Sequence, residues 1–207
     1  MKYATYENFR AVCARRGVPE ARCSSIYRDL VTRYSEKHRS YHNLEHIDRL
    51  LRIEAECGIT DDAVELATWF HDVIYDPKGE HNERKSADYF LSQFDGYVWY
   101  EFLSEVERLI LATDPTKARR GTNREDFMID VDLSILGTES TEYQSYTEAV
   151  REEYSFVPEQ DFREGRSKIL NSFLAHKIFA TEHFEKFEAQ ARSNITQELE
   201  RLENGAN

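Results

Sequence analysis

Two histidine-containing stretches have the clearest potential for chemistry. The first, 41-YHNLEHI-47, places His42 and His46 four residues apart in a chain that has only seven histidines. Residues four apart near the start of a helix share one face, so both imidazoles can point into the same space. Two imidazoles facing one cavity suit metal binding or proton transfer. The alternative is that one of them caps the helix and the other is a hydrogen-bonded histidine of the core.

The second stretch, 69-WFHDVIYD-76, places His71 and Asp72 side by side in an otherwise apolar segment. This segment is predicted to be a helix that Thr60 caps and that runs to the Tyr75–Pro77 break. An unpaired carboxylate among apolar side chains is costly, so a bound cation is the economical explanation. We expect His71 and Asp72 to bind one ion, with His46 as a third ligand from another helix.

The elements that must position these residues are helices. Each of the four prolines falls where an apolar period of three to four residues breaks, and no convincing alternating strand is found. The last of the expected helices is long and amphipathic and runs from Phe184 through Leu202. The sequence therefore predicts an all-α bundle of about eight or nine helices. We expect a single domain, residues 1–207, in which the helices of about 140–207 pack on the metal-binding core.

Composition excludes several classes of function. Thirty-nine acidic and 27 basic residues give a formal net charge of −12, which disfavours long nucleic acid and membrane surfaces as partners. The sequence has neither a signal-peptide pattern nor an apolar run of the roughly 20 residues that a membrane span needs. Its three cysteines form no Cys-x-x-Cys pair, which argues against a disulfide framework and a thiolate zinc site. A cytoplasmic protein is expected.

The order His46, His71-Asp72 and a later aspartate in 130-DVDLSILG-137 resembles the HD superfamily of metal-dependent phosphohydrolases. Members of that superfamily are all-helical and bind a divalent ion with these four side chains. The chain looks most like a group of bacterial predicted HD phosphohydrolases of similar length, and the resemblance covers nearly all of it. The matching segments are 39-RSYHNLEHI-47, 70-FHDVIYDP-77, 82-NERKSA-87, 109-LILATD-114, 130-DVDLSILG-137, 151-REEYSFV-157 and 188-EAQARSNI-195.

The resemblance implies an HD-domain-like bundle with one divalent ion, which would be Mn, Mg, Fe, Co, Ni or Zn. Helical spacing puts Asp130 and Asp132 on nearly opposite faces, and the apolar neighbours of Asp132 favour it as the fourth ligand. Asp130 would be solvated or would orient a ligating histidine. Related proteins often have a further histidine after the Leu-Ala-Thr stretch, whereas 112-ATDPTKARRG-121 has none, so a single ion is expected.

The Tyr-His-Asn-x-x-His portion also resembles the cyclic-nucleotide phosphodiesterases, where the first histidine is the acid for the leaving oxygen. This likeness implies that His42 donates a proton, and His42 and Asp72 are the expected catalytic residues. A bound divalent ion can bring the pKa of its water from about 15.7 toward neutrality and polarise a phosphoryl oxygen.

Further residues are candidates for binding the substrate or supporting the ligands. For substrate binding they are Arg39, Tyr41, Lys117 and Arg120. Guanidinium groups match phosphate geometry, but the basic residues of 117–124 can equally be a solvated loop. Support for the ligands is expected from Asn43, Asp130 and Glu83, and Asn82 and Glu83 can also cap the next helix. Arg151, Glu188, Arg192 and Asn194 belong either to a substrate pocket or to a network between helices.

The expected function is hydrolysis of a phosphomonoester or phosphodiester in a small, nucleotide-like substrate by a metal-activated water. The alternative is a regulatory module that binds metal and nucleotide with little turnover. Either function allows a homodimer.

Overall fold

The computed structural model describes residues 2–115 and 121–205, and within them the protein is all-helical, as predicted. The chain divides into two compact units, Met1–Val131 and Asp132–Asn207. The boundary lies inside one continuous helix, α7 (Asn123–Leu133). The packing of the helices of about 140–207 on the metal-binding core stays a prediction.

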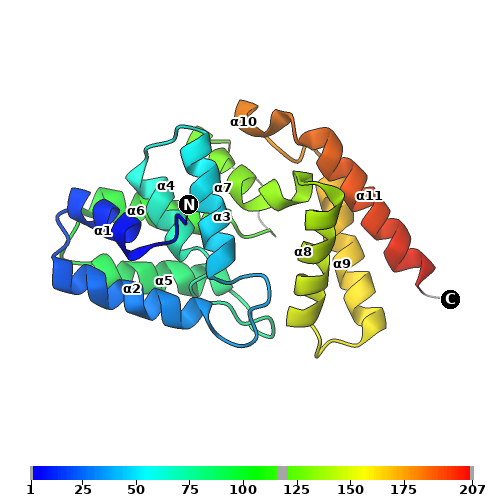
Figure 1. The fold of residues 1–207 in the computed structure, drawn as a ribbon, viewed down its shortest axis with the longest axis horizontal. Coiled ribbons are helices and arrows are strands. Elements are labelled where there is room, and N and C mark those ends of the chain that lie inside the picture. Colours follow the sequence, from blue (N-terminus) through cyan, green and yellow to red (C-terminus); the bar gives the residue numbers. More distant parts are fainter. Residues whose placement is uncertain (1, 116–120, 206–207) are drawn as a thin grey trace. The chain divides into compact units, whose positions relative to one another are not determined.

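The first unit contains seven helices in its described residues, and Figure 1 draws them from blue to green. They are α1 (Tyr6–Arg15), α2 (Glu20–Tyr34), α3 (Leu44–Glu56), α4 (Asp62–Phe70), α5 (Asn82–Phe94), α6 (Tyr100–Ala112) and α7 (Asn123–Leu133).

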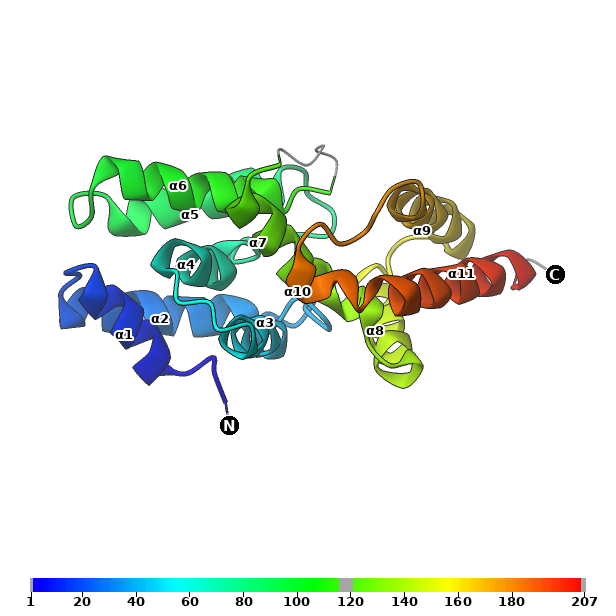
Figure 2. The same ribbon diagram turned by 90° about the horizontal axis from the view of Figure 1, so that it is seen from above.

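Helix α4 is the central helix of this unit. Seven of its nine residues are buried, so it is enclosed on all sides rather than along one stripe. In Figure 2 it lies between the α5–α6 pair and the group formed by α1, α2 and α3. The ring of Trp69 packs edge-on against Phe9 and that of Phe70 against Phe90, each with centroids 5.3 Å apart. The end of α4 is therefore held firmly by core packing, and the residues that follow Phe70 are anchored to it.

The observed limits of α4 differ from the prediction at both ends. Its N-cap is Asp61 rather than Thr60, because the Asp61 carboxylate accepts hydrogen bonds from two backbone N–H groups of the first turn. The helix ends at Phe70 and does not reach the Tyr75–Pro77 break. Val73 and Tyr75 are buried beyond the helix end, so the apolar pattern continues where the helix does not.

The second unit begins at the end of α7 and contains one short 3-10 helix and four α-helices. They are η1 (Ser134–Gly137), α8 (Ser140–Glu153), α9 (Glu159–Leu174), α10 (Glu182–Glu185) and α11 (Glu188–Asn204). The single helix predicted from Phe184 to Leu202 is thus two helices. The described residues hold eleven α-helices in all, more than the eight or nine expected.

The polar residues singled out in the second unit hold its own backbone. Asn194 donates from Nδ2 to the carbonyl oxygens of Leu136 and Thr138, at 2.9 and 2.8 Å. Glu188 accepts from the N–H groups of Ile178 and Phe179. Arg151 and Arg192 also donate to carbonyl oxygens within this unit. These contacts favour the structural alternative for all four residues.

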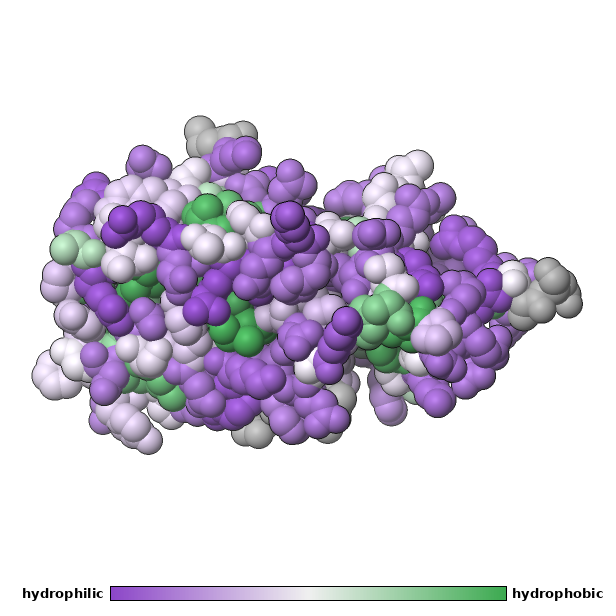
Figure 3. Space-filling model, turned by 90° about the horizontal axis from the view of Figure 1, so that it is seen from below, coloured by the Kyte–Doolittle hydropathy of each residue, from purple (hydrophilic) through white to green (hydrophobic). Residues whose placement is uncertain are grey.

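The face of the molecule drawn in Figure 3 is mostly hydrophilic and shows only small hydrophobic patches. No described helix combines the length and the apolar character that crossing a membrane requires.

Candidate metal centre

The first turn of α3 positions His46. Asn43 is the N-cap of this helix, and its Oδ1 accepts from the backbone N–H groups of Glu45 and His46 at 2.8 and 3.4 Å. Its Nδ2 donates to the carbonyl oxygen of Ser40 at 3.0 Å, which ties the helix to the preceding loop. The side chain of His46 is buried, with 1% exposed. The predicted supporting role of Asn43 is therefore that of a cap that fixes the backbone at His46.

His71 and Asp72 come directly after α4, in a turn rather than inside a helix. The backbone N–H of His71 still bonds the carbonyl oxygen of Ala67, at 2.8 Å. The His71 Nδ1 lies 3.0 Å from the carbonyl oxygen of Thr68, so Nδ1 carries the proton and Nε2 offers its lone pair. Ligating histidines in metalloproteins are commonly held in this way.

Three ligand atoms of His46, His71 and Asp72 converge. The two Nε2 atoms are 3.2 Å apart, and Asp72 Oδ2 lies 3.0 Å from His71 Nε2 and 3.6 Å from His46 Nε2. Ligands bound at about 2.1 Å around one ion are separated by about 3.0 Å in an octahedron and about 3.4 Å in a tetrahedron. The spacing of the three atoms therefore fits the coordination shell of one metal ion.

Asp132 joins the histidines from the last turn of α7. One ligand atom from each of His46, His71 and Asp132 lies within 4.8 Å of the other two, so this group can hold a metal ion. Together with Asp72, this is the one place in the described part of the chain where at least three potential ligands are seen to converge. Asp132 is half-buried.

The structure corrects the reasoning that separated Asp130 from Asp132. Asp130 was expected to be solvated or to support a ligand, and Asp132 to face the core. Asp130 is fully buried, with 0% exposed, which excludes the solvated alternative, and Asp132 is the more accessible of the two. A supporting role for Asp130 stays a prediction. Helix α7 has buried residues around much of its circumference, among them Glu125, Phe127 and Met128. Counting apolar neighbours therefore could not identify a single core face.

Asp72 is strongly disposed to stay ionised. Burial alone would raise its pKa, but the attraction of His71, and then of His42 and His46, outweighs that effect and holds the pKa of Asp72 well below its usual range. Its side chain is 16% exposed. The carboxylate is thus charged at neutral pH and available as a ligand.

His42 lies at the edge of this group. It precedes the Asn43 cap, so it is outside α3, and its ring centroid is 5.9 Å from that of His46. The ring stacks on Tyr75, with centroids 4.2 Å apart and planes inclined by 27°. Tyr41 meets it edge-on, with centroids 5.0 Å apart. His42 is therefore held near the ligands by aromatic contacts rather than by the periodicity of the helix.

The structure does not support the expectation that Arg39 binds the substrate. Its side chain is 0% exposed, and its guanidinium donates to the carbonyl oxygens of His42, Asp72 and Val73, at 3.0, 2.7 and 3.1 Å. It also pairs with Glu36 at 2.9 Å. With its donors used in this way, Arg39 ties the loop before α3 to the turn after α4.

The remaining residues predicted to bind the substrate or support the ligands lie in different places. Tyr41 lies beside the site, with its ring centroid 4.9 Å from that of His46. Glu83 lies in the first turn of α5, but the N-cap of that helix is His81 rather than Asn82. The roles proposed for Tyr41 and Glu83 stay predictions. Lys117 and Arg120 lie outside the described residues.

Sequence reasoning missed Thr68 and Glu54. Glu54 is buried in α3 and accepts a hydrogen bond from Thr68 Oγ1, while the Thr68 carbonyl holds His71. The signal for Thr68 was its position three residues before His71, since a carbonyl at a helix end lies within reach of such a side chain. For Glu54, the signal was only its position: it falls at the helical spacing of the buried residues of α3.

Comparison of the chain with protein-family models, with curated proteins and with solved structures found no match. The metal centre is therefore interpreted from its own geometry.

Proposed function

We propose that the protein is a metal-dependent phosphohydrolase of the HD type, which cleaves a phosphomonoester or phosphodiester in a small, nucleotide-like substrate. The observation that carries this proposal is the convergence of His46 Nε2, His71 Nε2 and Asp72 Oδ2 within 3.0–3.6 Å of one another.

The donor set favours a cation over a shared proton. A proton between two of these atoms satisfies one pair and leaves the third atom facing another electron-rich centre. A divalent ion satisfies both imidazoles and the carboxylate at once, and nitrogen with carboxylate oxygen suits Zn, Mn, Fe, Co or Ni. Asp132 is the expected fourth ligand. A bound ion supplies Lewis acidity and a water of lowered pKa.

The chain itself contributes proton transfer and orientation. The charge of Asp72 attracts the imidazolium form of His42, the form that can protonate a leaving oxygen. Stacking on Tyr75 restricts the rotation of that ring. The Thr68 carbonyl orients the His71 ring, and the Asn43 cap fixes the backbone at His46. His42 is thus the proposed general acid, and the other groups keep their positions during the reaction.

A compact substrate fits the electrostatics of the chain better than a polymer. The net charge of −12 repels extended polyanions. Arg124 of the basic segment is engaged with Asp61 and Glu105, so it does not stand free as a phosphate ligand.

The test combines metal analysis with a substrate screen. Protein purified without added metal is analysed by mass spectrometry of its metals, then assayed on mono-, di- and cyclic nucleotides with Mn, Mg, Co and Ni. We expect about one divalent ion per chain and turnover of at least one nucleotide. Asp72→Asn should lose both, whereas Asp88→Asn, which alters an exposed carboxylate paired with Arg84, should lose neither.

Two other outcomes are informative. Bound metal without turnover of any nucleotide would favour the regulatory module. Absence of binding for every metal offered would overturn the proposal.

A further inference from the structure

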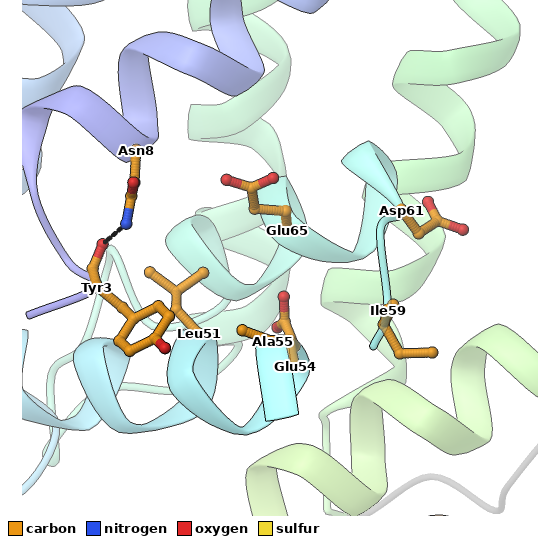
Figure 4. Close-up of a pocket in the computed structure, with 8 residues that line it drawn as sticks. All are labelled: Tyr3, Asn8, Leu51, Glu54, Ala55, Ile59, Asp61 and Glu65. Atoms are coloured by element: carbon orange, nitrogen blue, oxygen red, sulfur yellow. Dashed lines mark hydrogen bonds between the residues drawn. The ribbon is translucent and has the colours of Figure 1, made fainter. Parts of the chain in front are cut away.

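A pocket lies within the first unit, between α3, α4 and the N-terminal segment. Its volume is about 220 Å³. Figure 4 shows the residues that line it, which are Tyr3, Asn8, Leu51, Glu54, Ala55, Ile59, Asp61 and Glu65. Leu51 and Glu54 are buried, whereas Asn8 and Ala55 are exposed, so the former make the floor and the latter the rim.

Three of the lining residues are carboxylic acids, and among the described residues only two of these have a cationic partner. Asp61 pairs with Arg124 at 2.8 Å, and Glu65 pairs with Arg15 at 2.6 Å. Glu54 is 5% exposed and accepts a hydrogen bond on Oε1 from the neutral Thr68 hydroxyl. No ion pair and no second hydrogen bond of the Glu54 carboxylate is seen in the described residues, so its other oxygen is left for a ligand in the pocket.

The charges around Glu54 do not compensate for the burial of its carboxyl group. Burial raises the pKa of its carboxyl to about 8. The Thr68 hydrogen bond and the charge of His71 oppose that rise, while the negative charges of Glu65 and Asp61 add to it. A cation placed beside Glu54 would relieve both the burial of its charge and the repulsion.

The other walls define the kind of cation. Leu51, Ala55 and Ile59 present apolar side chains, which suit an alkyl chain. The three acids are not among the residues whose ligand atoms converge in the described part of the chain, which belong to the metal centre at His46 and His71. An ammonium group carries three N–H donors and can bind the Glu54 carboxylate and neighbouring oxygens together.

We propose that this pocket binds a small primary alkylammonium ion, whose charged group pairs with Glu54 and whose alkyl chain contacts Leu51, Ala55 and Ile59. The proposal does not depend on the metal centre or on phosphohydrolase activity.

The test uses n-butylammonium as the probe and n-butanol as its neutral counterpart of similar size. Each is titrated into the full-length protein at pH 8.5, and methyl signals of Leu51, Ala55 and Ile59 are followed by NMR. We expect saturable shifts with n-butylammonium and a dissociation constant on the order of 1 mM, as befits so small a ligand. n-Butanol should bind at least about tenfold more weakly, because it lacks the charge.

A matched pair of variants on α3 completes the test. Glu54→Gln keeps the volume but removes the charge, and should weaken n-butylammonium binding about tenfold or more. Glu56→Gln alters an exposed residue of the same helix that pairs with Arg52, and should leave binding unchanged. Equal binding of the amine and the alcohol to the wild-type protein, or no shift with either, would overturn the proposal even if the Glu54 variant failed to fold.

Discussion

His71 is held by Thr68, with the imidazole Nδ1 3.0 Å from the Thr68 carbonyl oxygen in the last turn of α4. A single contact thus fixes both the tautomer of the ring and the direction of its other nitrogen. Because α4 is packed on all sides, the carbonyl itself cannot easily move. The rigidity of a core helix is thereby transmitted to one ligand of the proposed metal centre.

Replacement of His42 should separate metal binding from turnover. His42→Ala is expected to keep the metal content and to lower kcat by about 10²–10⁴-fold, the usual contribution of a general acid. Metal analysis and steady-state kinetics are measured on the same preparation, with the exposed His176→Ala as the control. Unchanged kcat would reduce His42 to a packing partner of Tyr75.

Asp132 and Asp130 should fail in different ways. Asp132→Asn is expected to weaken metal binding about tenfold or more, because a neutral amide replaces an anionic ligand. Asp130→Asn should affect metal binding less, but it should lower the melting temperature because Asp130 is fully buried. Titration with Mn and differential scanning calorimetry distinguish the two effects. Greater metal loss in the Asp130 variant would show that Asp130, and not Asp132, is the ligand.

The Asn43 cap should support both stability and metal affinity. Asn43→Ala removes the acceptor for two N–H groups of α3 and is expected to cost about 1 kcal/mol in the free energy of unfolding. Metal affinity should also fall, since the backbone at His46 loses its anchor. Asn43→Ser retains an acceptor and should recover most of the stability, which urea denaturation can measure. An alanine variant as stable as the serine variant would contradict the role of the cap.

Glu54 should make the protein less stable as the pH rises. The pKa of its carboxyl is about 8 in the folded protein against an ordinary value of 4.5. Between these values the folded state keeps a proton that the unfolded state releases, so stability falls as pH rises through this window. Below the window, where both states are protonated, the effect disappears.

Glu54→Gln should therefore be more stable than the wild type at pH 9, by on the order of a few kcal/mol, with little difference at pH 4.5. Urea denaturation at both pH values measures this difference. Glu56→Gln should follow the wild type at both. A Glu54 variant whose advantage stays the same at the two pH values would show that titration is not the cause.

The helical class and the pair of ligand-bearing segments could be predicted because both depend on local patterns. Apolar residues recur with the period of a helix, and a carboxylate next to a histidine in an apolar segment is costly without a partner. The end of α4 could not be predicted, because Val73 and Tyr75 are buried in a turn and prolong the apolar pattern. The pattern records burial, which does not require a helix.

The role of Arg39 could not be predicted for a different reason. Its partners are backbone carbonyls of His42, Asp72 and Val73, and every residue type has such a group. An arginine beside a histidine motif therefore looks the same in the sequence whether it binds a phosphate or a loop. Only the three-dimensional path of the chain distinguishes the two.

The buried Arg39 also limits how far this site can be transplanted by design. Arg39 binds the carbonyl of His42 in the loop before α3 and that of Asp72 in the turn after α4. Both carbonyls lie outside the helices, so helical geometry does not fix their positions. A design that transfers only His46, His71 and Asp72 to another helical bundle would thus supply the donor atoms without the arginine that holds the two loops together. The portable unit comprises the ligands, the two loops and the arginine between them.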